Sequence, residues 1–223
     1  MGARDLSAKA RTVLIEKSGL TKEAIMLFAD AIFSIAITLL VLDIRLPTLP
    51  PGQEDAAFSG ALWQTVPALV GFVVSFFVIA LYWRAFHRMM QYIRQFDQPM
   101  LWLTLAFLFM IAIMPFPTAV LGAYGNNRMP IAFYQSMIAL SSLAMFAMWW
   151  HASHGGRLID PDLDPRLIRL NTIRQLVPAF VMLVTLPVTF YYTGYAEVSW
   201  VIMIPLTVLV RRFFGVKEEP FFA

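Results

Sequence analysis

Residues 24–46 read AIMLFADAIFSIAITLLVLDIRL, and this stretch decides the fold of the chain. It is apolar over roughly the 20 residues that a helix needs to cross a bilayer. Asp30 is the one ionisable side chain inside it before Asp43 and Arg45 at its far end. A carboxylate at the centre of a membrane helix costs about 2.5–3.5 kcal/mol on insertion scales. Asp30 therefore needs a protein partner or a water-filled cavity.

The composition is that of a protein that crosses the membrane several times. Of the 223 residues, 59% are hydrophobic and 14% are charged, a balance that soluble domains do not have. Five further apolar stretches predict membrane helices, at about 60–83, 100–123, 130–152, 173–193 and 197–213. We therefore expect an all-α integral membrane protein with six transmembrane helices.

The distribution of basic residues predicts the orientation of these helices. Of the 17 Lys and Arg residues, all but Arg45 and Arg128 fall in the tails and connections on one side of the predicted map. Because basic residues collect on the cytoplasmic side, both termini are expected there. Residues 1–23 and 214–223 would be cytoplasmic tails around a transmembrane domain at 24–213. The same rule accounts for a pI near 9.3, so we expect no nucleic-acid partner.

The sequence lacks the motifs of common catalytic and cofactor sites. It contains no cysteine, no H-E-x-x-H, no G-x-S-x-G and no glycine-rich phosphate loop. His151 and His154 precede the acidic run DPDLDP, but this run lacks the Gly and the terminal Glu of a calcium loop. We expect no enzyme, no cofactor and no resident metal. The TVGYG loop is also absent, so a filter of that type cannot operate.

Two side chains of the second predicted helix are candidate partners for Asp30. Arg84 and His87 lie in ALYWRAFHRMM, near the same membrane face as Asp30. We expect one of the two to pair with Asp30 in a structural polar network. The alternative is that both only extend toward lipid phosphates. Trp83, which lies beside them, is interpreted as an interfacial anchor.

Three stretches in the first half of the chain carry a family resemblance. They are FADAIFSIAITLLVLDIRLP, SFFVIALYWRAFHR and FDQPMLWLTLAFLFMIAIMPFPTAVLG, in this order. Together they resemble the first three helices of the transmembrane protein 175 family of potassium channels, whose first helix begins R-x-x-x-F-S-D. Asp30 and His87 match polar residues of that family. The positions of its Arg, Ser, a paired His and an Asn hold Ala24, Ala29, Phe86 and Thr104.

The resemblance implies a potassium-selective cation channel in the bacterial plasma membrane, surrounded by lipid. Single-repeat bacterial members of the family assemble as homotetramers, and the first helix of each subunit lines a central pore. Potassium ions and three further copies of the chain are the partners expected on this basis.

The pore face implied by the resemblance can be located on the first helix. At about 100° per residue, one line along the surface of this helix contains Phe28, Ala31, Ile35, Thr38, Leu39, Leu42 and Leu46. Asp30 lies about 140° from Ile35 and so cannot share this face. Ile35, Thr38, Leu39 and Leu42 are the expected constriction and selectivity element, with Ile35 and Leu42 about 10.5 Å apart. Rings of such alkyl side chains resist wetting.

Two other functions remain open on the sequence. In a secondary transporter, Asp30 and His87 would form an ion or proton site. In a non-conducting membrane scaffold, the apolar line of the first helix would only pack or face lipid. Transporters built from repeats place buried acids in corresponding positions of both halves, and the second half of this chain has no counterpart of Asp30.

Overall fold

The computed structural model describes residues 21–47, 52, 54–125 and 127–191. Within these ranges the regular structure is helical, apart from one isolated bridge between Ile93 and Ile159. Five helical segments of this part are long and apolar enough to cross a membrane. The expectation of an all-helical, multi-span protein is confirmed. The predicted sixth span, 197–213, and both predicted tails lie outside the described residues, apart from 21–23.

The first span comprises helix α2, Lys22–Leu39, and the 3₁₀ turn η1, Leu40–Asp43. Thr21 caps α2, because its hydroxyl accepts a hydrogen bond from the Ala24 amide at 3.2 Å. The sequence predicted one helix to residue 46, whereas the α-helix ends at Leu39. In a 3₁₀ turn, side chains three residues apart nearly eclipse one another.

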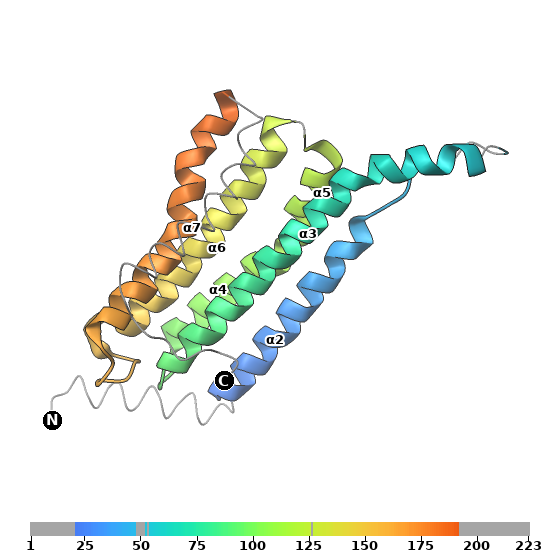
Figure 1. Cartoon of the computed structure of the whole chain (residues 1–223). Coiled ribbons are helices and arrows are strands. Elements are labelled where there is room, and N and C mark those ends of the chain that lie inside the picture. Colours follow the sequence, from blue (N-terminus) through green and yellow to red (C-terminus); the bar gives the residue numbers. More distant parts are fainter. Residues whose placement is uncertain (1–20, 48–51, 53, 126, 192–223) are drawn as a thin grey trace.

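The second span is helix α3, Glu54–Tyr92, and it exceeds the predicted span 60–83 at both ends. Its 39 residues reach about 58 Å at 1.5 Å per residue, well beyond a bilayer core. Figure 1 shows its first turns leaving the bundle, while its last turns run beside α2. His87 and Arg88, which lie beyond the predicted end of the span at residue 83, are therefore part of this helix.

The third span is divided into α4, Gln98–Ile113, and α5, Pro115–Tyr124. The break falls at Met114, directly before Pro115. Pro115 has no N–H to continue the α-helical hydrogen bonds. The Met114 amide instead donates to the Ile111 carbonyl at 3.1 Å, which tightens the last turn of α4.

The chain continues through α6, Arg128–Ser153, a short 3₁₀ turn η2, His154–Gly156, and α7, Pro165–Tyr191. Gly155 and Gly156 adopt φ values of 69° and 64°, a conformation that favours glycine and that ends α6. Helix α7 begins eight residues before the predicted start at 173. The helices lie side by side, with α2 at one edge of the bundle and α7 at the opposite edge (Figure 1).

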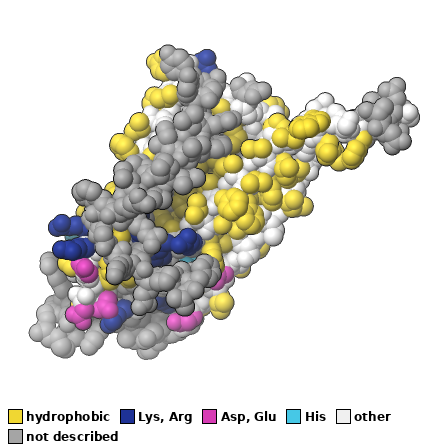
Figure 2. Space-filling model, viewed as in Figure 1, with side chains coloured by type: hydrophobic (Ala, Val, Ile, Leu, Met, Phe, Trp, Pro, Cys, Tyr) yellow, Lys and Arg dark blue, Asp and Glu magenta, His cyan; other side chains and the backbone are white. Residues whose placement is uncertain are grey.

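We call the end of the bundle where α2 begins and α3 ends the charged end. Here the Lys22 ammonium donates to the Ile93 carbonyl at 2.7 Å, and Arg94 forms an ion pair with Asp160. The Arg94 amide also donates to the Leu158 carbonyl at 2.8 Å. On the face that Figure 2 shows, basic and acidic side chains gather at this end, and many hydrophobic side chains lie between the two ends.

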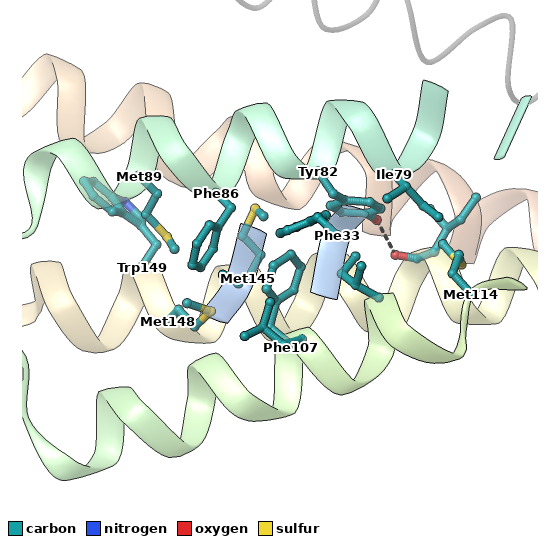
Figure 3. Packing of buried hydrophobic residues seen from close by; sticks show 14 of the residues in the cluster. Phe33, Ile79, Tyr82, Phe86, Met89, Phe107, Met114, Met145, Met148 and Trp149 are labelled. Atoms are coloured by element: carbon teal, nitrogen blue, oxygen red, sulfur yellow. Dashed lines mark hydrogen bonds between the residues drawn. The ribbon is translucent and has the colours of Figure 1, made fainter. Parts of the chain in front are cut away.

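The core is built from aromatic and methionine side chains of α2, α3, α4 and α6 (Figure 3). Phe33, Phe86 and Phe107 are almost fully buried and meet at ring-centroid distances of 5.8–6.1 Å. Such aromatic contacts add about 0.5–1.5 kcal/mol beyond area burial. This cluster fixes α2 against α3 and α4, and so decides which face of α2 remains uncovered.

Candidate functional site

Helix α2 has one buried face and one exposed face. The buried face consists of Ile25, Ala29, Phe33, Ala36 and Leu40, each at most 4% exposed. These residues recur at intervals of three and four, so they form one stripe along the helix. Small Ala29 and Ala36 alternate with larger side chains, which lets α2 lie close to its neighbours.

The seven residues of the expected pore line all lie on the exposed face. Among the expected constriction residues, the side chains of Ile35 and Leu42 are 57% and 65% exposed, and Leu39 is also exposed. No other described helix covers them, although they are long alkyl groups. The described part of the chain thus presents an uncovered apolar stripe along α2 and η1.

Thr38 lies on the same exposed face, but its hydroxyl is turned to its own helix. Thr38 Oγ1 lies 3.0 Å from the Ser34 carbonyl oxygen and 2.9 Å from the Ile35 carbonyl oxygen. This is the usual back-bonding of a threonine within a helix. The hydroxyl hydrogen is therefore used within α2, and only the oxygen lone pairs and the methyl group remain for other contacts.

The 3₁₀ turn changes the expected spacing on this face. Four α-helical steps and three 3₁₀ steps separate Ile35 from Leu42, which gives a rise of about 12 Å rather than the predicted 10.5 Å. Leu39 and Leu42 are three residues apart across η1, so they lie nearly in line. Leu40, between them, is 1% exposed and holds the turn against its neighbours.

Asp30 is bound by two side chains of α3. The Trp83 indole N–H donates to Asp30 Oδ1 at 2.8 Å, and His87 Nε2 lies 3.2 Å from the same oxygen. His87 Nδ1 faces the Trp83 carbonyl oxygen at 3.1 Å. Each ring nitrogen of His87 thus lies opposite an oxygen atom. The structure brings Asp30 and His87 together.

The structure separates Arg84 from this contact. Arg84 is exposed, and within the described residues it forms neither an ion pair nor a hydrogen bond with Asp30. Its place beside Asp30 is taken by Trp83, which the sequence analysis had interpreted as an interfacial anchor. The indole N–H is a donor without charge, so it can satisfy a carboxylate oxygen in apolar surroundings at a lower desolvation cost than an arginine.

Three buried positions on α2, α3 and α4 differ in side-chain chemistry from what the family resemblance gives. Ala29, Phe86 and Thr104 occupy places where the family resemblance gives polar side chains. Ala29 and Phe86 are fully buried, and the Thr104 hydroxyl donates to the Met100 carbonyl at 2.8 Å in its own helix. Around Asp30 the three helices are held by side-chain packing more than by a wide polar network.

A second carboxylate–histidine contact lies between α4 and α6 at the charged end. His151 Nε2 lies 3.0 and 2.9 Å from the two oxygens of Asp97. Asp97 Oδ1 also caps α4 by accepting from the Met100 amide at 2.9 Å. The sequence analysis assigned no role to Asp97. The signal for it was the Asp-Gln-Pro run, an N-cap residue followed by proline in the first turn.

No group of three His, Asp or Glu side chains that could hold a metal ion occurs in the described part of the chain. The acidic residues after His154 are used locally instead. Asp160 accepts from the Asp162 amide at 3.2 Å, and Asp164 accepts from the Arg166 amide at 2.8 Å at the start of α7. The run DPDLDP thus forms a turn and a helix cap.

Comparisons with known proteins agree with this architecture. Residues 25–115 match the family model of the endosomal/lysosomal potassium channel TMEM175. A potassium channel of Streptomyces collinus is 37% identical over 153 residues, which cover 66% of this chain and 72% of that protein. A potassium channel of Chamaesiphon minutus is 29% identical over 140 residues, covering 61% of this chain and 68% of that protein.

The fold also has a solved counterpart. A crystal structure of a lysosomal potassium-selective channel TMEM175 homolog from Chamaesiphon minutus superimposes with a TM-score of 0.70. It covers 86% of this chain and 97% of that chain at 22% sequence identity. The stretch that matches the family model covers α2 from residue 25 and all of α3 and α4, so it includes Asp30, Trp83 and His87. The chain is a multi-pass membrane protein and belongs to the TMEM175 family.

Proposed function

We propose that this chain forms a homotetrameric potassium channel in the bacterial plasma membrane, with the exposed face of α2 lining the pore. One observation carries this proposal: the expected pore line coincides with the face of α2 that the described helices leave uncovered, including Ile35 and Leu42. The relatives named as potassium channels support the choice of ion. Membrane lipids would surround the assembly.

Hydrophobic rings explain how such a pore could select ions without a carbonyl filter. Four copies each of Ile35, Leu39 and Leu42 would offer a passing ion no oxygen ligands. An ion must then shed part of its hydration shell or wait until the ring widens, and the narrow apolar segment resists wetting. Potassium sheds water more readily than sodium, so the constriction would favour potassium. The in-line arrangement of Leu39 and Leu42 would lengthen the apolar segment.

Single cysteine substitutions test whether this face lines a water-filled path. The natural chain contains no cysteine, so Ile35→Cys and Leu42→Cys would each carry one reactive thiol. Reconstituted channels of both variants should lose most of their potassium flux after treatment with a water-soluble, charged thiol reagent. Phe180→Cys is the matched control, because Phe180 is 65% exposed on α7, on the opposite edge of the bundle. Equal insensitivity of all three variants would contradict the pore assignment.

The contact between Asp30 and His87 favours secondary transport as the second candidate function. A carboxylate and an imidazole 3.2 Å apart could exchange a proton. A transporter would move protons in fixed proportion to potassium, whereas a channel would pass potassium down its gradient without such coupling. Recording the internal pH of potassium-loaded liposomes during flux separates the two, and a scaffold would give no flux at all.

A further inference from the structure

Two buried amides on α7 are not accounted for by the channel proposal. Asn171 and Gln175 are 4% and 8% exposed. Asn171 Nδ2 and Gln175 Oε1 are buried without a hydrogen-bond partner in the described structure. Most buried polar atoms in proteins have a partner, so a donor and an acceptor that both lack one require an explanation. Both amides lie on the same helix, one turn apart.

The chemistry around Gln175 fixes which way its amide points. Gln175 Nε2 lies 3.6 Å from the Met89 sulfur on α3. A thioether sulfur can only accept a hydrogen bond, so the amide nitrogen belongs on this side. Oε1 must then face away from Met89. The contact links α7 to α3, the helix that also carries Trp83 and His87.

One unpartnered atom is a hydrogen-bond donor and the other is an acceptor, and their residues are four apart on α7. Residues four apart on a helix have Cβ atoms about 5–6 Å apart and lie on one face. The amides form no direct hydrogen bond, and an N–H donor beside a carbonyl acceptor matches a ligand that can both accept and donate. We propose that one buried water molecule binds between Asn171 and Gln175, accepting from Nδ2 and donating to Oε1.

A water molecule fits this site better than a cation does. A monovalent cation needs several oxygen ligands, whereas this pair presents one free oxygen and one N–H group, whose positive end would repel it. A buried water needs two to four polar partners, and the two amides provide two of them. Because both amides are buried, the water would be retained as part of the fold.

A double-substitution cycle tests the shared water in the full-length protein. Asn171→Leu, Gln175→Met and the double variant are purified in detergent, and their unfolding temperatures are measured by tryptophan fluorescence. If a water joins the two amides, each single change leaves the other amide without its full hydrogen bonding and lowers the unfolding temperature. The double change removes both polar groups and should recover at least half of the summed loss. Ser141→Ala is the control, because the Ser141 hydroxyl bonds the Met137 carbonyl of its own helix.

Additive effects of the two changes would overturn the proposal. Without a water, each substitution removes an independent unpartnered group, so both single variants would be more stable than the natural protein. Residues in contact can also couple through packing alone. A structure of the natural protein that shows ordered waters therefore completes the test. Density within hydrogen-bond distance of both atoms supports the water, and its absence overturns it.

Discussion

Asp30 is the one ionisable residue of α2 beyond its first two positions, and its two contacts explain how the helix tolerates it. Both contacts come from α3 and from the same turn of it, because Trp83 and His87 are four residues apart. The carboxylate therefore fixes the rotation of α2 against α3. With this rotation Asp30 points away from the line of Ile35 and Leu42, as the helical spacing predicted. We propose that it supports the structure rather than coordinating the permeating ion.

Substituting Asp30 tests this supporting role. Asp30→Asn keeps an oxygen for the Trp83 indole but removes the charge opposite His87, whereas Asp30→Leu removes both contacts. Breaking a buried pair costs about 3–5 kcal/mol, but the Asp30 side chain is 41% exposed, so we expect only about 1 kcal/mol for Asn. Leu should cost more. Thermal unfolding and the yield of assembled oligomer on size-exclusion chromatography measure both effects.

The control for this experiment is Asp43→Asn. Asp43 is an exposed carboxylate on the same span, so its neutralisation should leave unfolding temperature and yield nearly unchanged. If Asp30→Asn assembled and unfolded like the natural protein but lost ion selectivity, Asp30 would face the pore and its assignment here would be wrong.

At the scale of the helices, the break between α4 and α5 is held by a cluster of three buried hydroxyls. The Thr118 hydroxyl lies 2.8 Å from Ser75 Oγ on α3 and 2.9 Å from the Met114 carbonyl at the break. Ser75 Oγ in turn lies 2.8 Å from the Tyr134 hydroxyl on α6. A broken helix leaves backbone groups unpaired, and in a membrane these must be satisfied by neighbours. The Met114 carbonyl also accepts from the Thr118 amide at 3.3 Å, so the cluster adds to this pairing and joins three helices beside the break.

Removing the Thr118 hydroxyl should weaken this junction. Thr118→Val keeps the shape of the side chain but leaves the Met114 carbonyl and Ser75 with fewer partners, a loss of about 1–3 kcal/mol. For a protein of this size that corresponds to about 2–4 °C in unfolding temperature per kcal/mol. Thr65→Val is the matched control, since the Thr65 hydroxyl bonds only the Ala61 carbonyl of its own helix. Equal effects of both changes would contradict a special role for the cluster.

The helices differ in how far the sequence could define them. Hydropathy located every described span, because apolar length is a direct requirement of the bilayer. It underestimated α3, because charged residues past the membrane face continue the helix without changing its direction, as His87 and Arg88 do. It could not foresee that the α-helix of the first span ends at Leu39, since no Pro or Gly marks that point.

For the candidate site, the exposed line on α2 was predicted from the family resemblance together with the helical period. Side-chain partners were harder to predict, because they depend on the rotation of one helix against another. Arg84 and His87 were equal candidates for Asp30 by depth, but only His87 faces α2. For the same reason, the sequence did not reveal that Trp83 contacts Asp30 or that Asp97 contacts His151.

At the scale of the whole molecule, α2 lies at the edge of the bundle (Figure 1), and it carries the uncovered stripe. Exposed hydrophobic side chains also run along the adjoining part of α3, including Phe77 and Leu81. A helix at the edge of one subunit cannot enclose a path for ions. Copies related by a central axis could do so, which is why the proposed pore requires an assembly and why the proposal names a homotetramer.

Ion flux through reconstituted protein tests this central proposal most directly. Liposomes with a potassium or a sodium gradient should contain the natural chain, Ile35→Asn or Leu42→Asn at matched density of assembled protein. Asparagine supplies dipoles that stabilise water in the constriction, so both variants should pass more current and discriminate less between potassium and sodium. Thr38→Ala should change flux less, because its hydroxyl is bonded within α2. Unchanged flux and selectivity in both asparagine variants, with assembly intact, would contradict a pore lined by α2.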